Sequence, residues 1–473
     1  MTRIAIAWFR RDLRLHDHPA LTAALQGADA VIPVFVLDDA LLAGRWPSPN
    51  RLWFMRESAV ALSAALAERG AWLRVVRGRP EQVLPQLAQE TGAQDVYVTR
   101  DASPYGRRRD RLVAEALASG GVAMHAIRGL YVHEPDELAT GDGRPYVVYS
   151  PFRRAWAARP RRAVIPAPDR IPGPSSGRGR PDPVPELGPP TADPSLLPTP
   201  GEAAARARLD AWLRGGVDGY ADRRNRMDLD GTSRLSQDLR WGLLSPVEIV
   251  DRAEGPGDGR RVFVDEVAWR EFYAHVLWHH PRVLREPFQP AFAALPWRSD
   301  PDSFEAWRSG QTGYPVVDAA MRQLRATGWM HNRARMIAAS FLAKHLLLDW
   351  RLGEAEFMRH LVDGDVASNN GGWQWTASTG TDPQPYFRVF NPVLQGRRFD
   401  PDGAFVRRWV PELRGIEGPA IHDPWTLDAA AQARAGVRIG HDYPAPIVDH
   451  AAARERALAT YGAARRAADS PDA

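Results

Sequence analysis

Short hydrophobic runs alternate with amphipathic stretches over the first 130 positions of the chain. Five apolar runs predict strands, and the stretches between them show the three- and four-residue apolar spacing of helices. The predicted strands are residues 4–9, 31–37, 73–76, 96–99 and 122–127, and the predicted helices are residues 19–25, 51–69, 81–90 and 108–118. Strands that alternate with helices in this way are typical of a parallel sheet covered on both faces, so residues 1–130 are expected to form a doubly wound α/β domain.

Polar residues follow the predicted strands at their carboxyl ends, where ligands of such domains bind. These residues are Arg10, Arg11 and Asp12, then Asp38 and Asp39, then Arg100 and Asp101. The first strand is not followed by the glycine-rich G-x-G-x-x-G turn of dinucleotide-binding domains. The pattern therefore indicates a ligand site at this edge of the sheet but disfavours a conventional Rossmann dinucleotide site.

A proline-rich stretch separates this region from a helical one. Thirteen prolines fall within residues 160–200, and we expect residues 131–201 to form an extended connector, with no core of its own in the proline-rich stretch. Helical apolar spacing follows, most clearly over residues 262–278, 315–327, 334–348 and 355–361. No strand series is visible there, so residues 202–465 are expected to form an all-α domain.

The composition mainly excludes classes of protein. The chain has no cysteine, which excludes disulfides, thiolate-bound metals and cysteine nucleophiles. Lys344 is the only lysine and does not follow a glycine-rich loop, which excludes a P-loop nucleotidase. The net charge of +4 rests almost wholly on arginine and suits a polyanionic partner without requiring one. Neither a membrane-spanning run nor a secretory signal is visible, so a cytoplasmic protein is expected.

Two segments of the helical region suggest a site for a polar ligand. Residues 230–240 cluster hydroxyl groups at a predicted helix start, which could seat a phosphate or form a simple N-cap. One face of the next long predicted helix carries Glu266, Trp269, Arg270 and Tyr273. This mixture of charged and aromatic side chains fits a cavity for an aromatic polar ligand, although a solvated face remains an alternative.

Two further segments add candidate binding groups. Asn332, Arg335 and Met336 share a helix face and together suit a nucleobase. Asp363 and Asp365 flank a glycine, but the oxygen ligands of a calcium loop and a histidine pair are both missing around them. No metal site is therefore expected.

Six motifs, in this order along the chain, resemble the DNA photolyase and cryptochrome family. They are WFRRDLRLHD at residues 8–17, TSRLS at 232–236, WREFY at 269–273, GYPVVDAAMR at 313–322, WMHNR at 329–333 and DGDVASNNGGWQW at 363–375. The resemblance extends from residue 3 to about residue 462 and is similar in detail to the class I cyclobutane pyrimidine dimer photolyases with a deazaflavin antenna. It implies FAD folded in a U shape within the helical domain, a cavity that opens on a basic DNA-binding face, and light-driven repair of pyrimidine dimers.

The resemblance also implies the residues that hold FAD. The diphosphate is expected at Tyr220, Thr232, Ser233, Arg234, Leu235 and Ser236. Arg270 is expected on the flavin-facing side of its helix. Asp363 and Asp365 are expected to contact the ribityl chain and the ring edge, with Arg335 paired to Asp363. Asn369 is expected to face flavin N5, where plant cryptochromes carry aspartate and animal-type cryptochromes carry cysteine, and asparagine supports the fully reduced anionic flavin used for repair.

Seven positions match the contacts that the family makes with a lesion flipped out of the duplex. They are Glu266, Asn332 and Met336 for the lesion, Trp269 and Trp375 for the apolar wall, and Arg224 and Arg333 for the flanking phosphates. Glu266 is expected to hydrogen-bond the dimer and is a candidate proton donor to its developing radical anion.

Three tryptophans match the family's chain of electron carriers from the protein surface to oxidised flavin. They are Trp373, Trp350 and Trp297. Twelve of the 17 tryptophans lie between residues 212 and 425, and tryptophans in a helical domain usually serve core packing, so their number alone does not indicate function.

The expected second chromophore is an 8-hydroxy-5-deazaflavin antenna in the α/β domain. Members of the family that use folate carry an Asn-Glu pair in the loop after the fourth strand, where this chain has Tyr105 and Gly106. The residues that resemble the deazaflavin type are Asp38, Arg51, Asp101 and Arg240. A folate, FMN or an empty cleft remains the alternative.

Three rival functions are compatible with parts of the pattern. A cryptochrome light sensor shares the fold and the flavin, but Glu266, Met336 and Asn369 argue against it. A (6-4) photolyase would carry a histidine pair near the lesion, where this chain has His331 beside Asn332 and no second histidine nearby. A plain nucleic-acid-binding module would lack flavin. The expectation is a monomeric enzyme that acts on DNA containing pyrimidine dimers.

Overall fold

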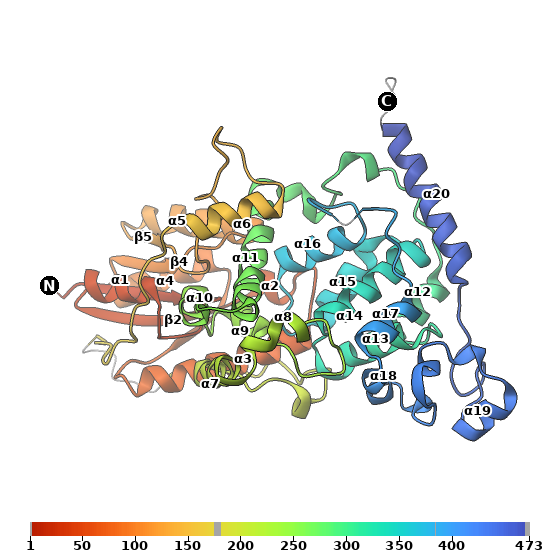
Figure 1. Ribbon diagram of the computed structural model, residues 1–473. Coiled ribbons are helices and arrows are strands. Elements are labelled where there is room, and N and C mark those ends of the chain that lie inside the picture. The colour runs from red at the N-terminus through yellow and green to blue at the C-terminus, as the bar shows by residue number, and fades with distance from the viewer. Residues whose placement is uncertain (1, 175–180, 384, 469–473) are drawn as a thin grey trace.

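The chain folds into a parallel-sheet part at its N-terminal end and a larger helical part (Figure 1). The computed structural model describes residues 2–174, 181–383 and 385–468. We call residues 2–130 the α/β part and residues 202–468 the helical part. No helix in these described ranges is long and apolar enough to span a membrane.

The sheet has five strands in the order β3-β2-β1-β4-β5, and all neighbouring pairs are parallel. The strands are β1 Ile4–Phe9, β2 Ala30–Asp38, β3 Arg74–Gly78, β4 Asp95–Thr99 and β5 Ala123–Ile127. The strand order reverses between β1 and β4, as in doubly wound folds. The expected α/β architecture is therefore confirmed.

Side chains of β1 alternate between the two covered faces of the sheet. Ala5, Ala7 and Phe9 pack with helices α1 (Pro19–Gly27) and α3 (Pro49–Ala67). Ile6 and Trp8 pack on the opposite face with the remaining helices. These are α4 (Pro80–Thr91) and α5 (Pro104–Ser119), while the short α2 (Asp39–Leu42) follows β2. The same core cluster that holds α1 and α3 continues into the helical part, so the two parts share buried contacts.

Two of the helices begin earlier than the apolar spacing predicts. Helix α3 starts at Pro49 and α5 at Pro104, each after a serine whose side chain accepts a backbone hydrogen bond. Proline suits the first helical turn because its missing N–H would have no partner there, and its fixed φ is already helical. These caps extend the helices beyond their periodic apolar residues.

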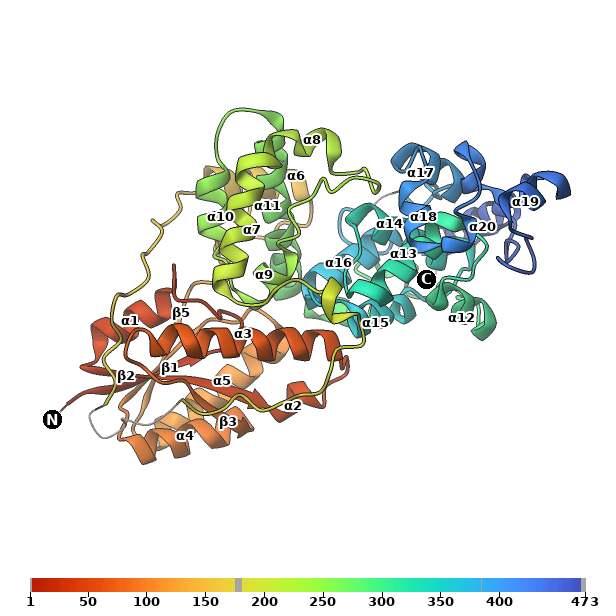
Figure 2. The same cartoon turned by 90° about the horizontal axis from the view of Figure 1, so that it is seen from below.

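The connector contains a helix that the pattern does not predict. Helix α6 (Tyr149–Ala158) buries Phe152 and Trp156 against α11 (Asp258–His279). In its described residues, the proline-rich stretch after it has no α-helix or strand and one 3₁₀ turn, Pro194–Leu196, and its Ile171 is fully buried. Ile171 N donates to Arg69 O at the end of α3, and Asn50 Oδ1 accepts from Ala192 N at its start. Figure 2 shows this segment returning along α3.

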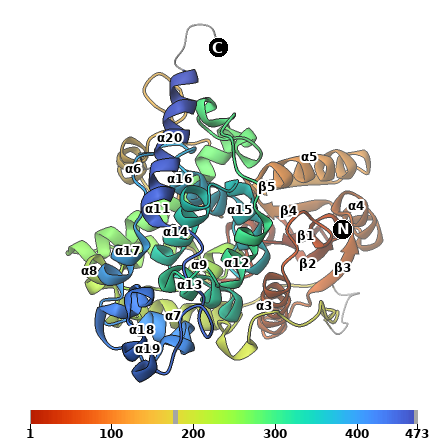
Figure 3. The same cartoon turned by 90° about the vertical axis from the view of Figure 1, so that its right-hand side faces the viewer.

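The helical part is made of fourteen α-helices in the described residues. Besides α11 they are α7 Glu202–Gly215, α8 Tyr220–Arg223, α9 Ser236–Trp241, α10 Pro246–Ala253, α12 Pro301–Ser309, α13 Pro315–Thr327, α14 Asn332–Ser340, α15 Trp350–His360, α16 Val366–Thr376, α17 Pro392–Phe399, α18 Ala404–Trp409, α19 Ala429–Ala435 and α20 His450–Ala468. The helix expected over residues 334–348 ends at Ser340 and continues as a π-helical turn, Phe341–His345. Figure 3 shows α13 to α16 gathered near the middle of the helical part and α20 along its outer side.

Candidate functional site

A cavity of about 470 Å³ opens within the helical part. Its wall is built by the loop before α9 and by α8, α11, α14 and α16, together with the segment between α15 and α16. The expected site residues that line it are Tyr220, Arg224, Thr232, Ser233, Arg234, Leu235, Ser236, Glu266, Trp269, Arg270, Asn332, Arg335, Met336, Asp363, Asp365, Asn369, Trp373 and Trp375. Segments separated by about 150 residues are therefore brought to one site.

The hydroxyl-rich segment forms the entry to α9, whose first residue is Ser236. The preceding residues make a loop in which Arg234 has a φ of +50°, a conformation that few residues other than glycine adopt. The Arg234 guanidinium lies over the Trp329 ring at 4.6 Å and pairs with Asp230 at 3.2 Å. The loop thereby brings the hydroxyl-bearing residues Thr232, Ser233 and Ser236 to the cavity wall.

One face of α11 contributes Glu266, Trp269, Arg270 and Tyr273 to the cavity wall, so this face is not simply solvated. Trp269 stacks on Tyr149 of α6 with ring centroids 3.6 Å apart. Burial raises the pKa of Glu266 above its ordinary value, and an ion pair with Arg224 at 2.6 Å opposes this shift. The cavity wall therefore places a carboxyl group with a raised pKa beside a rigid aromatic surface.

Helix α14 supplies a second polar face. Asn332, Arg335 and Met336 line the cavity as the spacing predicts. His331 caps the helix by accepting from Arg333 N at 3.1 Å. Burial lowers the pKa of His331 to about 4, so this histidine is neutral at pH 7.

Two carboxylates between α15 and α16 face the cavity with different partners. Arg335 donates to Asp363 Oδ2 at 2.7 Å, which is the pairing that the resemblance implies. Asp365 caps α16 by accepting from Ala367 N at 3.0 Å and Ser368 N at 3.1 Å. Burial alone would raise the pKa of Asp365, but nearby arginines, Arg11 foremost, lower it to about 2. The group is ionised under all ordinary conditions.

Several buried polar atoms of the cavity wall have no hydrogen-bond partner among the described residues. These are Asp363 Oδ1, Arg240 Nη1 and Trp373 Nε1. Asn369 Nδ2 donates to the backbone oxygen of Glu354 at 3.1 Å, which leaves the amide Oδ1 to accept from a ligand. Buried polar atoms normally find partners, so the wall suits a large ligand with donors and acceptors on an aromatic ring. Together with the hydroxyl-rich loop for a diphosphate, this set fits FAD.

The three expected electron carriers differ in burial, and one of them lines the cavity. Trp373 lines the cavity, Trp350 is fully buried at the start of α15, and Trp297 is half-buried. All three belong to or pack against one hydrophobic cluster. A Cβ on Gly353 would come within 2.0 Å of the Trp373 ring, so α15 packs directly on that indole.

The remaining expected residues lie outside the cavity or in other contacts. Arg333 does not line the cavity; its Nη2 donates to Asn225 at 2.7 Å and its guanidinium lies over Phe399 at 4.5 Å. Arg224 reaches the cavity wall, so the two expected phosphate ligands occupy different surroundings. Among the described residues no group of His, Asp and Glu side chains gathers as a metal site would require.

Of the four expected antenna residues, Arg240 lies within electrostatic range of two others, Asp101 and Arg51. Asp38 accepts from Tyr105 Oη at 2.5 Å, and Asp101 pairs with Arg109 at 3.4 Å. The Arg51 guanidinium donates to main-chain oxygens, including Leu361 O at 3.2 Å. Arg240 lines the helical cavity and donates to Gly364 O at 2.9 Å. Within the part of the chain that the structure describes, no hydrogen bond or ion pair joins any two of the four.

Sequence reasoning missed two residues that shape the site. Tyr149 supports Trp269 from α6, and Arg11 of the α/β part donates to Asp365 at 2.6 Å. Tyr149 stands next to the proline-rich stretch and carries no periodic signal. Arg11 was visible as a polar residue at a strand end, but its partner lies 354 positions away.

The comparisons with known proteins cover nearly the whole chain. Residues 5–172 match a family model described as DNA photolyase, and residues 263–463 match one described as the FAD binding domain of DNA photolyase. The deoxyribodipyrimidine photo-lyase of Streptomyces griseus is 44% identical over 462 residues, covering 96% of this chain and 98% of the relative.

Two solved structures share the fold. A bacterial class III photolyase from Agrobacterium tumefaciens has a TM-score of 0.93 at 40% identity, with 98% of each chain covered. A cryptochrome from Synechocystis sp. PCC6803 has a TM-score of 0.88 at 32% identity, covering 97% of this chain and 99% of the other. Matching family models at both ends of the chain, together with a near full-length relative, show that this chain belongs to the DNA photolyase family.

Proposed function

We propose that this protein is a deoxyribodipyrimidine photo-lyase that uses light to split cyclobutane pyrimidine dimers in DNA. The observation that carries the proposal is the cavity itself, because its lining combines Glu266, Asn332 and Met336 with the residues that fit FAD. The names of the curated relatives agree with this activity.

The protein's own residues prepare the ligand end of the cavity. When bound, FAD supplies the chemistry, an electron that light drives to the dimer and that afterwards returns. The Arg335–Asp363 pair fixes one carboxylate oxygen and leaves the other to accept from the ligand ring. The Glu354 carbonyl orients the Asn369 amide so that its oxygen faces outward from α15. These contacts would hold the ring of a bound FAD in one orientation.

The lesion end combines an acid, an amide and an apolar wall. Extrusion of a dimer from the duplex costs a few kcal/mol, less than for an intact pair because the lesion stacks poorly. Trp269, held by Tyr149, and Trp375 provide apolar contacts that offset this cost. Burial raises the pKa of Glu266, which eases proton uptake by its carboxyl; once protonated, this group would donate to a pyrimidine carbonyl as negative charge develops there.

A comparison of lesions tests this substrate assignment. The FAD-loaded protein, chemically reduced, is illuminated with matched oligonucleotides that carry one cyclobutane dimer, one (6-4) photoproduct or no lesion. We expect restoration of bases only in the cyclobutane substrate. Restoration of the (6-4) substrate, or binding that does not distinguish damaged from undamaged DNA, would contradict the assignment.

We further propose that the α/β part holds an 8-hydroxy-5-deazaflavin as a second chromophore. The support is the absence of the folate-type Asn-Glu pair and the position of Asp38 and Asp101 at the carboxyl ends of β2 and β4. Arg51 and Arg240 hold main-chain oxygens, and Arg240 Nη1, which has no partner among the described residues, is left to donate to the chromophore. Reconstitution with the deazaflavin should create a new visible band and sensitise FAD, whereas uptake of only folate, only FMN or neither would refute the proposal.

A further inference from the structure

The loop between β1 and α1 contains the WFRRDLRLHD motif, and the proposed function does not use it. This loop lies between the sheet and the helical part. Leu13 N donates to Trp241 O at 3.1 Å, and Arg14 Nη1 donates to Gly242 O at 2.9 Å, so the loop contacts the end of α9. Gly242 has a φ of +61°, and a Cβ there would lie 2.0 Å from Arg11 O. Only glycine permits this close approach.

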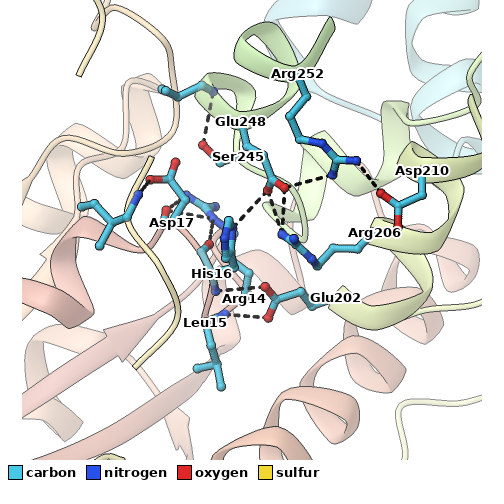
Figure 4. Close-up of polar contacts among 12 residues, drawn as sticks. Arg14, Leu15, His16, Asp17, Glu202, Arg206, Asp210, Ser245, Glu248 and Arg252 are labelled. Atoms are coloured by element: carbon cyan, nitrogen blue, oxygen red, sulfur yellow. Dashed lines mark hydrogen bonds and ion pairs between the residues drawn. The ribbon is translucent and has the colours of Figure 1, made fainter. Parts of the chain in front are cut away.

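The far end of the loop is anchored by charged side chains of the helical part (Figure 4). Leu15 N and His16 N donate to the Glu202 carboxylate of α7 at 2.7 and 2.9 Å. His16 Nδ1 lies 3.2 Å from Glu248 of α10, which also accepts from Arg206 at 2.9 Å. Main-chain donors and ion pairs together fix this end, so the loop has little freedom to shift.

The near end of the loop reaches the FAD site. Arg11 Nη2 donates to Asp365 Oδ2 at 2.6 Å, while Asp365 Oδ1 caps the first turn of α16. Helix α16 carries Asn369 and Trp373, both of which line the cavity. A residue of the α/β part thus holds the carboxylate at which this helix begins.

Arg11 is also the direct charge partner of Asp365. Two other arginines lower the pKa of Asp365 from a distance, but Arg240 donates to Gly364 O and Arg270 donates to Leu130 O. Charge-assisted hydrogen bonds are about twice as strong as neutral ones. Loss of the Arg11 guanidinium would therefore leave a less compensated negative charge at the cavity wall.

We propose that Arg11 is a positioning residue for the FAD site, acting through Asp365 to fix the start of α16 and to balance the charge beside the bound flavin. The inference rests on the proposed FAD-dependent function. An uncompensated carboxylate disfavours addition of electrons to a nearby ring, so removal of the guanidinium should make the flavin harder to reduce. It should also weaken FAD binding, because α16 loses a fixed cap.

The test compares Arg11→Met and Arg11→Lys with a matched control, Arg10→Met. Arg10 lies in the same loop and pairs with Asp110 inside the α/β part, without a contact to Asp365. The measurements are FAD affinity, the midpoint potential of the bound flavin in the dark, and thermal unfolding. We expect Arg11→Met to bind FAD about tenfold more weakly and to have a lower potential. Arg11→Lys should keep a midpoint potential close to that of the parent. Arg10→Met should lower only the unfolding temperature.

A cycle with Asp365→Asn separates positioning from general destabilisation. In the Asp365→Asn background, Arg11→Met should weaken FAD binding less than it does in the parent, because the guanidinium then has no carboxylate to hold. The inference would be overturned if Arg11→Met had the same midpoint potential as the parent. It would also be overturned if Arg10→Met changed the midpoint potential as much as Arg11→Met does. If Arg11→Met does not fold, the comparison uses Arg11→Lys and Asp365→Asn. A change in midpoint potential in Arg11→Lys as large as the change in Asp365→Asn would also overturn the inference. Failure of the parent to repair dimers would refute the proposed function. The midpoint potential of bound FAD, measured in the dark, would still test the role of Arg11, because it does not require repair.

Discussion

At the scale of single residues, Glu266 is the side chain on which the repair assignment depends most. Its carboxyl lies in the cavity wall, its pKa is raised by burial, and its ion-pair partner is Arg224. The sequence predicted its place through the spacing of the α11 face. The Arg224 partner was not predictable, because the two residues lie on different helices.

Replacement of Glu266 should separate lesion recognition from FAD binding. Glu266→Ala should keep FAD but bind dimer-containing DNA about tenfold more weakly and repair it with a lower yield, because a charged or strongly polarised hydrogen bond is lost. Asp265→Ala is the matched control, since Asp265 pairs with Arg153 and does not line the cavity. Equal repair per absorbed photon in parent and Glu266→Ala would remove this residue from the lesion site.

At the scale of elements, the pattern predicted those that follow a regular period. The strands and the α11 face were predictable because buried positions recur every two or every three to four residues. Helix α6 was missed because it stands beside the proline-rich stretch, and its Tyr149 gains meaning only by stacking on Trp269. The contact of Arg11 with Asp365 depends on how the sheet meets α16, which no local pattern encodes. The domain bounds 1–130, 131–201 and 202–465 stay predictions.

The packing of α15 on α16 includes a buried acid that should make stability depend on pH. Burial raises the pKa of Glu354 to about 7, while a hydrogen bond from Asn370 opposes the shift. A carboxyl whose pKa is higher in the folded state stabilises the fold fully below its unfolded pKa. This contribution is lost as pH rises through the folded pKa.

Glu354→Gln should therefore flatten the decline of stability between about pH 4.5 and pH 7. The amide oxygen can still accept from Asn370 but cannot ionise. We expect the free energy of unfolding of the variant, relative to the parent, to rise by on the order of 1–3 kcal/mol from pH 5 to pH 8. Urea titrations at the two pH values measure it, and parallel pH profiles for parent and variant would contradict the assignment.

At the scale of the whole molecule, Trp373, Trp350 and Trp297 are predicted to carry electrons between the protein surface and the cavity. Trp350→Phe should reduce light-driven reduction of oxidised FAD to below about a tenth of the parental rate, because phenylalanine is a poor electron donor. Repair by flavin that was reduced chemically should remain nearly intact. Trp425→Phe, a half-buried indole against the same cluster, serves as control. Equal photoreduction in Trp350→Phe and the parent would refute the path.

The mouth of the cavity should determine how strongly DNA binding depends on salt. Each phosphate contact adds about 0.9 to the slope of log affinity against log salt. Arg224→Ala and Arg333→Ala should each reduce the slope for damaged DNA by about that amount. Arg77→Ala should not, because Arg77 lies on the α/β part and pairs with Asp39. An unchanged slope in both Arg224→Ala and Arg333→Ala would place the DNA elsewhere.

The monomeric state, the cytoplasmic location, the class I assignment and the deazaflavin antenna stay predictions at this scale. Repair itself is the most direct measurement. The reduced, FAD-loaded protein is mixed with an oligonucleotide that carries one thymine dimer, and restored thymines are counted after blue light and after darkness. The account predicts restored thymines only with light and only with reduced flavin. Repair in the dark, or intact dimers after illumination of fully reduced protein that has bound the substrate, would contradict it.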